Sequence, residues 1–260
     1  MTNKEILQIA LAQQAEDMNC RPEDFQKKDN VVVLSKVNDR ARKYLDLPFF
    51  CNLVSYGSNV VASTDERIAD FVKTYLEREQ AANGTFYESF LTPRLHLLTE
   101  EFARFGMLVS FMAEYFLPDI RELCALPCPY DVRILTPQEF ASFYSEKWSN
   151  ALYEKRKPLD VLAAAAYDGN TLVGLAGCSA DCDSMWQIGV DVLPAYRRQG
   201  IASALTSRLA LEILDRGKVP FYCAAWSNIR SVRNALRSGF RPAWVECTAI
   251  PREKAEEYMK

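Results

Sequence analysis

The sequence predicts an α/β (α+β) fold in which helices flank a mixed sheet. In the C-terminal half, a strand at 186–192 passes through a short turn into a helical segment that begins at Ile201. Ahead of that strand, 161–167 and 171–178 form a hairpin around Asp168-Gly169-Asn170, which is a strong turn sequence. The N-terminal half also alternates extended and helical segments. This alternation is typical of domains that pack helices on a sheet.

Residues 186–192 are the best-defined strand. Apolar and polar side chains alternate along them, and this period of two indicates a strand with one buried face. Pro194 ends the strand because proline has no N–H for the ladder. The apolar residues of 201–213 then follow a helical spacing, and Gly217 is the expected cap of that helix.

The turn between this strand and this helix has the composition of a phosphate site. The first N–H groups of a helix have no partner within it, and the helix dipole favours negative charge there. Gly200 and Ala202 are small enough to let a diphosphate approach the backbone, and Arg197 and Arg198 add positive charge. The competing interpretation is an ordinary turn with solvated arginines.

Three further elements are predicted downstream. Residues 219–226 form a strand, Ser227-Asn228 begin a helix that ends at Gly239-Phe240, and 241–250 form a last strand. One side of that helix carries the apolar residues Ile229, Val232, Ala235 and Leu236.

Two motifs in this half resemble the GNAT N-acetyltransferase superfamily. They are V-x-P-x-Y-R-x-x-G-I-A at 192–202 and N-x-x-S…G-F at 228–240, and the resemblance covers 131–250. It implies acetyl-coenzyme A, or another acyl-coenzyme A, as co-substrate, with no metal. The pyrophosphate would lie on 197–203 and the pantetheine beside 190–192. The binding residues it implies are Val190, Asp191, Val192, Arg197, Arg198, Gln199, Gly200, Ile201, Ala202, Ser203 and Asn228.

Acyl transfer to an amine asks little of a protein. The neutral amine must be held close to the carbonyl, and a donor must meet the developing oxyanion. We expect that donor to be the backbone N–H of Val192 or of its neighbour on the strand. The resemblance implies a tyrosine seven residues after Asn228 as proton donor to the thiolate, but that position is Ala235. Tyr222 and Asp191 are weak catalytic candidates, and each also has a purely structural interpretation.

The leading hypothesis is an acyl-coenzyme-A-dependent N-acyltransferase that acts on a small amine or an amino-terminal group by direct transfer. A covalent route through Cys223 would lack an activating histidine. The alternative is a non-catalytic module that binds or senses acyl-coenzyme A, and Ala235 favours it. A purely structural α/β protein would leave the 197–203 turn unexplained.

Residues 1–127 are predicted to be a separate α/β domain without a coenzyme A loop, and 128–260 the acyl-coenzyme-A-binding domain. Pro127 and Pro129 mark the boundary, because proline interrupts both helix and ladder. The N-terminal elements are expected at the following residues: helix 1–20, extended 30–35 and 49–63, helix 65–80, extended 85–89, helix 92–106 and strand 107–117.

The order of elements in 50–117 is the order expected for 186–250. The N-terminal domain can therefore be a degenerate copy that has lost the loop, since Asp65 and Glu66 stand where a phosphate would lie. An unrelated α/β cap is the equal alternative. Neither interpretation allows acyl-coenzyme A to bind there.

Composition excludes several other classes. The net charge is −3, without a block of basic residues, so nucleic-acid binding has no electrostatic support. No apolar run approaches the ~18–20 residues of a membrane span, and the first twenty residues lack the apolar core of a secretory signal. We expect a cytoplasmic protein with no membrane partner.

The eight cysteines and the one histidine give no metal site. Cys124 with Cys128, and Cys178 with Cys182, have a spacing that zinc sites use, but no histidine or C-x-x-C accompanies them. We expect buried free thiols instead. His96 shares a helical stripe with Leu98 and Phe102, so we expect it at the edge of a core, far from acyl transfer.

Overall fold

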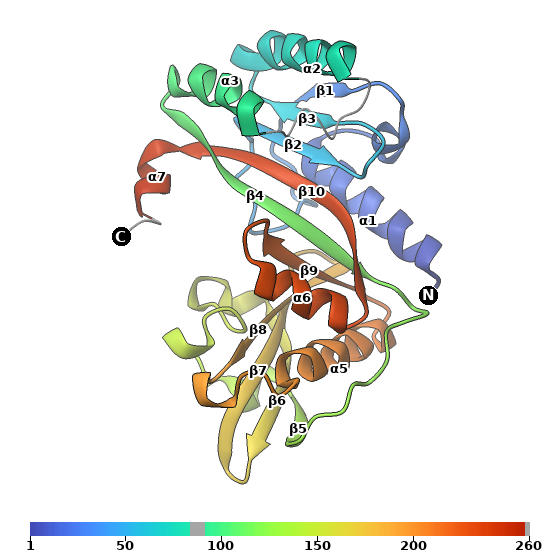
Figure 1. The fold of residues 1–260 in the computed structure, drawn as a ribbon, viewed down its shortest axis with the longest axis vertical. Helices are drawn as coiled ribbons and strands as arrows, with labels where there is room; N and C mark the ends of the chain where they lie inside the picture. The colour runs from blue at the N-terminus through green and yellow to red at the C-terminus, as the bar shows by residue number, and fades with distance from the viewer. Residues whose placement is uncertain (84–91, 258–260) are drawn as a thin grey trace. The chain divides into compact units, whose positions relative to one another are not determined.

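The computed structural model describes residues 1–83 and 92–257 (Figure 1). The chain divides into two compact units, each made of two chain segments. The first unit comprises Met1–Ala10 and Tyr115–Pro242, and the second comprises Leu11–Glu114 and Ala243–Lys260. Three elements pass from one unit into the other: α1 (Asn3–Met18), β4 (Met107–Pro118) and β10 (Phe240–Pro251). The boundary predicted at 127/128 lies within the first unit, whereas the chain changes units within α1, β4 and β10.

The sheet of the first unit has the strand order β9-β8-β7-β6-β5. Its strands are β5 (Asp131–Leu135), β6 (Asp160–Asp168), β7 (Thr171–Ser179), β8 (Met185–Val192) and β9 (Val219–Ala225). Neighbours are antiparallel except β8 and β9, which are parallel. The predicted hairpin is confirmed as β6 and β7, and Gly169 in its turn has φ +56°. Glycine adopts this left-handed conformation at little cost.

Helix α5 (Ile201–Asp215) covers one face of this sheet, and the chain between β5 and β6 covers the other. Along β6, Ala164 and Ala166 belong to the cluster that holds Leu205 of α5. The alternate residues Ala163 and Ala165 pack with Trp148 instead. This is the period of two expected of a strand that is buried on both faces.

Thr136-Pro137-Gln138-Glu139 has the sequence of a helix start with a capping-box glutamate, and it predicts a helix that runs toward Trp148. Thr136 and Glu139 do form the capping box, but α4 spans only Pro137–Phe140, followed by 3₁₀ turns at Glu146–Trp148 and Glu154–Leu159. The chain turns out of the helix after Phe140, and Trp148 and Ala151 further along it pack on the sheet. A Cβ on Gly189 would lie 1.9 Å from the carbonyl oxygen of Asn150, so the loop backbone contacts the backbone of β8 directly.

Helix α6 (Ile229–Arg237) begins after its predicted cap, since the Asn228 side chain accepts a hydrogen bond from the N–H of Ser231. Its apolar side is only partly buried. Ala235 is fully buried in the core, but Ile229 and Leu236 are 52% and 47% exposed. The polar residue Asn234 bonds to α5, as described below.

The second unit holds β1 (Val31–Leu34), β2 (Cys51–Ser55) and β3 (Val61–Thr64), with sheet order β1-β3-β2-β10-β4. Its helices are α2 (Ala69–Asn83), α3 (Thr92–Ala103) and α7 (Arg252–Glu257), with 3₁₀ turns at Pro22–Gln26 and Glu66–Ile68. Val72 and Leu76 of α2 and Leu98 and Phe102 of α3 pack on Leu53 of the sheet. The elements expected in this half are present, except that 85–89 lies outside the described residues.

His96 is not at a core edge as predicted. It lies on α3 but is exposed, whereas Leu98 and Phe102 of the same helix are buried. A residue two positions from Leu98 points away from the buried side, because helix neighbours on one face are three or four residues apart.

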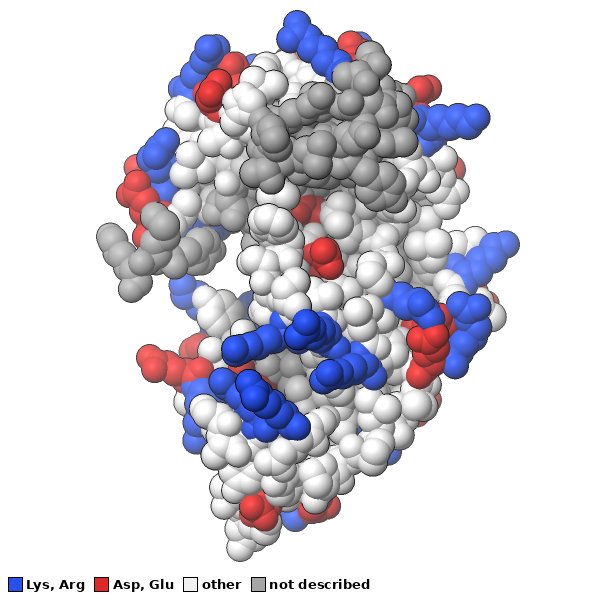
Figure 2. Space-filling view, in the orientation of Figure 1, with Lys and Arg blue, Asp and Glu red and all other residues white. Residues whose placement is uncertain are grey.

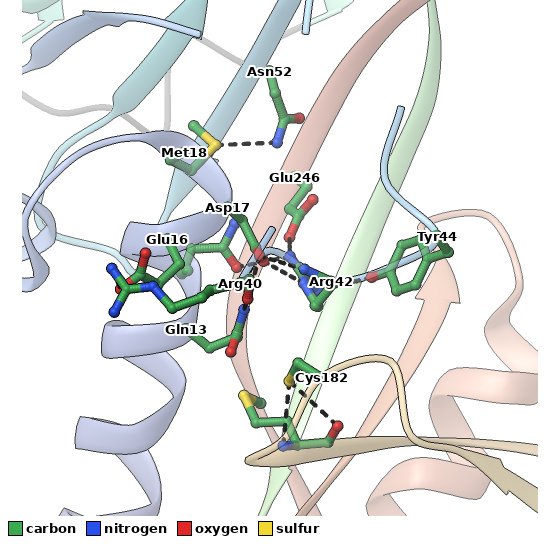
Figure 3. A network of polar contacts seen from close by, with 12 residues as sticks. Gln13, Glu16, Asp17, Met18, Arg40, Arg42, Tyr44, Asn52, Cys182 and Glu246 are labelled. Carbon is green, nitrogen blue, oxygen red and sulfur yellow. Dashed lines mark hydrogen bonds and ion pairs between the residues drawn. The ribbon is translucent and has the colours of Figure 1, made fainter. Parts of the chain in front are cut away.

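The second unit also buries a charged cluster (Figure 3). Arg42 is 2% exposed, forms an ion pair with Asp17 and donates to Glu246 Oε1 at 3.0 Å. It also donates to Tyr44 Oη at 2.8 Å and to Gln14 Oε1 at 3.0 Å. One guanidinium therefore pairs with two buried carboxylates that come from opposite ends of the chain. In the two described stretches, no helix has the length and apolar character needed to cross a membrane.

Candidate active site

The strands β8 and β9 separate part of the way along their length. Their parallel ladder covers only the pairs from Met185–Val219 to Ile188–Tyr222, although β8 continues to Val192 and β9 to Ala225. On its other side β8 stays paired with β7 through Val192. Over the part of the chain that the structure describes, no ladder therefore pairs 189–192 on the side of β9. Backbone groups there can hydrogen-bond an extended ligand that carries amides, in the way that they would pair with an additional strand.

The separated half of β8 leads into a left-handed turn and then into α5. Arg198 and Gly200 have φ +66° and +82°, and Gly200 is the N-cap of α5 without a side-chain cap. A Cβ on Gly200 would meet no atom within 4 Å. The first N–H groups of α5 thus face open space at the positive end of the helix dipole, which is the geometry of an anion site.

Polar and aromatic contacts hold this turn in place from outside. The hydroxyl of Tyr196 donates to Asp168 Oδ2 at 3.0 Å, and that of Tyr130 donates to Gln199 Oε1 at 2.8 Å. The two tyrosine rings meet edge to face, 5.5 Å apart. Arg197 Nε donates to the carbonyl of Val192 at 3.1 Å, which ties the turn to the end of β8.

A pocket of about 670 Å³ lies between this turn and α6. Figure 2 shows basic side chains gathered over this face of the first unit. Of the residues that the sequence predicted for coenzyme A, the pocket is lined by Val192, Arg197, Arg198, Gly200, Ile201, Ala202 and Ser203. The lining residues that sequence analysis missed are Pro194, Tyr196, Arg230, Arg233, Asn234 and Arg237. The arginines at 230, 233 and 237 have the spacing of one helix face, and this pattern could have revealed them.

Four of the predicted binding residues do not line the pocket. Gln199 is exposed and bound to Tyr130, and Asn228 caps α6. Val190 packs with the α5 side of the core, and the side chain of Asp191 points to the opposite face of the sheet.

Asparagine 234 joins the two walls of the pocket. Its Oδ1 accepts from Ser203 Oγ at 3.0 Å, and its Nδ2 donates to Thr206 Oγ1 at 3.1 Å. Ser238, at the end of α6, donates to the carbonyl of Ser203 at 3.3 Å. The first turn of α5 and the last turns of α6 are therefore held in one geometry.

The two weak catalytic candidates occupy different surroundings. The carboxylate of Asp191 accepts hydrogen bonds from the backbone N–H groups of Asn150 and Ala151 at 2.9 and 3.0 Å. It is therefore already bound to the loop before β6. Tyr222 is the last β9 residue paired with β8, at the point where the strands separate. It is 4% exposed, and its hydroxyl lies 2.9 Å from Ser231 Oγ of α6. Burial raises the pKa of Tyr222, which keeps its proton in place at neutral pH.

Ala235 stands where the family resemblance implies a tyrosine, and it is fully buried in the core. It offers no proton to a leaving group. Cys223 is half-buried on β9, and His96 belongs to the second unit. Among the described residues, no three His, Cys, Asp or Glu side chains gather to hold a metal ion, and none of the cysteines there is in a disulfide.

Residues 122–240 match the model of the acetyltransferase (GNAT) family. This region belongs to the GNAT superfamily. The match contains the end of β8, the turn, α5 and α6, whose residues line the pocket, and it also contains β9. No curated protein matches the chain.

Solved structures of GNAT proteins align with parts of the chain at low identity. One is a GNAT-family acetyltransferase from Novosphingobium aromaticivorans, with 19% identity, a TM-score of 0.42, and coverage of 55% of this chain and 66% of that one. A GCN5-related N-acetyltransferase-like protein from Streptococcus suis has 22% identity, a TM-score of 0.43 and coverage of 61% and 68%. A GCN5-related N-acetyltransferase from Sphaerobacter thermophilus has 16% identity, a TM-score of 0.46 and coverage of 73% and 71%.

Proposed function

We propose that this GNAT protein transfers an acyl group from acyl-coenzyme A, with acetyl-coenzyme A as the first candidate, to the nitrogen of a small amine or of an amino terminus. The observation that carries the proposal is the separation of β8 from β9, which opens beside the uncapped start of α5 and its pocket. The family match supports acyl-coenzyme-A-dependent N-acyl transfer as the general activity.

The proposed binding mode follows from the groups that each part of the site offers. The first N–H groups of α5, with Arg197 and Arg198, would hold the diphosphate. The exposed edge of β8 at 189–192 would hydrogen-bond the pantetheine amides, as an added strand does. The thioester would then lie near Ile188 and Tyr222, where the strands meet again.

The proposed chemistry is one direct substitution at the thioester carbon. The neutral amine attacks the carbonyl, a backbone N–H of β8 stabilises the oxyanion, and the C–S bond then breaks. The sulfur leaves with the bonding electrons and takes a proton, for which the Tyr222 hydroxyl is the proposed donor. The amine loses its proton to water or to another substrate group. No covalent intermediate on Cys223 is needed.

Titration calorimetry with acetyl-coenzyme A, followed by thiol release against a panel of amines, tests the proposal. Gly200→Glu should abolish binding, because a carboxylate would then fill the turn and repel the diphosphate. Gly217→Glu is the matched control: Gly217 also has a positive φ and also has no atom within 4 Å of its Cβ position, but it lies at the far end of α5. It should bind normally.

Each outcome has a separate meaning. Amine-dependent thiol release establishes the transferase and identifies its class of acceptor. Binding without release against every amine would support the non-catalytic module instead. Equal affinity of Gly200→Glu and wild type for acetyl-coenzyme A would refute the proposal that the turn at Gly200 binds the diphosphate.

A further inference from the structure

Three arginines on α6 face the pocket, and the proposed binding of the diphosphate does not use them. Arg230, Arg233 and Arg237 line the wall opposite the turn that carries Arg197 and Arg198. Their spacing of three and four residues places all three on one face of the helix. We call them the α6 arginine row.

The row is not explained by ion pairs. Within 1–83 and 92–257, none of the five pocket arginines forms an ion pair with a carboxylate. Other surface arginines of the same unit do: Arg208 and Arg216 pair with Glu212 at 2.8 and 2.9 Å. Five like charges around one pocket repel one another, and a bound anion would offset that repulsion.

The stability of α6 itself does not explain the whole row either. Arg237 lies in the last turn, where a cation suits the helix dipole, but the first turn contains Arg230 and no acidic residue. A cation at the positive end of the helix dipole is unfavourable, and acidic residues are the usual choice there. Arg230 breaks this preference, and no acidic residue in the same turn compensates for it. Such exceptions are expected at functional sites.

The pocket has room for more than a diphosphate. Its volume of about 670 Å³ lies within the range of roughly 300–1,000 Å³ that whole small-molecule ligands occupy. The nucleotide end of coenzyme A carries a second anion, the ribose 3′-phosphate, which as a monoester holds about −1.5 to −2 charges near pH 7. The planar forks of arginine suit phosphate oxygens better than lysine does.

We propose that Arg230, Arg233 and Arg237 bind the 3′-phosphate of coenzyme A and make this protein discriminate against acyl donors that lack it. The proposal rests on the proposed function, since it concerns the same ligand. The contacts of Asn234 with Ser203 and Thr206 fix the distance between the row and the turn. One wall then receives the diphosphate while the other receives the monoester.

Titration of coenzyme A against dephospho-coenzyme A measures this directly, because the two ligands differ only in the 3′-phosphate. Hydrogen bonds to charged groups contribute about 1.5–3 kcal/mol, so wild type should bind coenzyme A on the order of ten- to a hundredfold more tightly. The variant Arg230→Gln/Arg233→Gln/Arg237→Gln should bind both ligands within about twofold of each other. Arg233→Gln alone should show a smaller preference than wild type.

The control variant Arg104→Gln/Arg208→Gln/Arg216→Gln removes the same charge from exposed ion pairs that do not line the pocket. It should keep the wild-type preference. The ratio of the two affinities also cancels any general loss of anion binding. Circular dichroism of each variant checks that α6 remains folded.

Each contrary result has its own meaning. Equal binding of the two ligands by wild type would overturn the 3′-phosphate site and leave the proposed function standing. A preference that survives in the row variant would place the phosphate elsewhere. Binding of neither ligand by wild type would refute the proposed function, and this inference with it.

Discussion

Asn150 holds the carboxylate of Asp191 at two points. Its backbone N–H donates to Oδ2 at 2.9 Å and its Nδ2 donates to Oδ1 at 2.6 Å, while the N–H of Ala151 adds a third bond. The carbonyl of Asn150 rests on Gly189, where a side chain would not fit. The loop before β6 is therefore fixed on the half of β8 that separates from β9. Asp191 acts in this structure as the anchor of that loop.

Asp191→Ala should lower the free energy of unfolding by roughly 1.5–3 kcal/mol, because the variant loses hydrogen bonds to a charged acceptor. Asp191→Asn should lose less. Urea denaturation measures both. As an anchor, Asp191 should contribute to stability, and folded Asp191→Asn should keep a kcat close to that of wild type. A loss of kcat on the order of 10²-fold in the folded variant would instead place Asp191 in the chemistry.

Tyr222→Phe should leave the fold intact, because the ring keeps its contacts with Phe116 and Phe240. If the hydroxyl is the proton donor to the thiolate, kcat should fall on the order of 10²-fold with coenzyme A affinity unchanged. Steady-state kinetics with calorimetry separates the two quantities.

Ser231→Ala is the matched control for Tyr222→Phe, since it removes the same hydrogen bond but keeps the phenol. Its kcat should change far less. Equal kcat values for the two variants would mean that the hydroxyl of Tyr222 is structural. Because burial raises the pKa of Tyr222 above its usual ~10, no alkaline limb below that pH should come from this residue.

Asp160 should make the first unit less stable as pH rises from about 4 to 6. Burial raises the pKa of Asp160 to about 6, despite the hydrogen bond from Tyr144 and the charge of Arg156. The folded state then binds this proton more tightly than the unfolded state does. The slope of unfolding free energy against pH is negative between the two pKa values, and the full cost is present above pH 6.

Asp160→Asn keeps an acceptor for the Tyr144 hydroxyl and removes the titration. Urea denaturation at pH 4, 5, 6 and 7 should show that the variant gains stability over wild type as pH rises. The difference between the two proteins cancels carboxylates that titrate in the opposite sense, such as Glu139, whose hydrogen bonds from Thr136 lower its pKa. A constant difference across this range would contradict the prediction.

Arg42→Ala should destabilise the second unit by about 3–5 kcal/mol, because it leaves Asp17 and Glu246 buried without their partner. Arg40→Ala, two residues away, removes an exposed pair with Glu16 and should cost less than about 1 kcal/mol. Thermal unfolding of both variants gives the comparison. Similar losses of stability in the two variants would show that the buried ion pairs of Arg42 contribute no more than an exposed pair does.

The sequence predicted those parts of the first unit whose structure is set locally. The β8 strand, the Gly200 turn and α5 follow from periodicity and from one glycine, and all three are present. The helix after Thr136 was predicted too long, because the chain that follows it packs on the sheet and is bound by Asp191 at Asn150 and Ala151, a distant contact that leaves no local pattern.

The arginine row was missed for a related reason. Its spacing marks one helix face, but the sequence does not show what that face lies against, since the bonds of Asn234 to Ser203 and Thr206 join two helices and leave no periodic pattern. The separation of β8 from β9 is also invisible in either strand alone. The degenerate-copy hypothesis for the N-terminal half remains a proposal, supported by the order β3, α2, α3, β4.

Because α1, β4 and β10 change units along their length, no single cut of the polypeptide yields a complete unit. A fragment that begins at residue 128 lacks Met1–Ala10 and the end of β4. During synthesis, the second unit cannot close until Ala243 and the residues after it have left the ribosome, although most of that unit is made first. Glu246 belongs to this late segment. The cluster of Arg42, Asp17 and Glu246 therefore cannot be completed until the first unit has been translated.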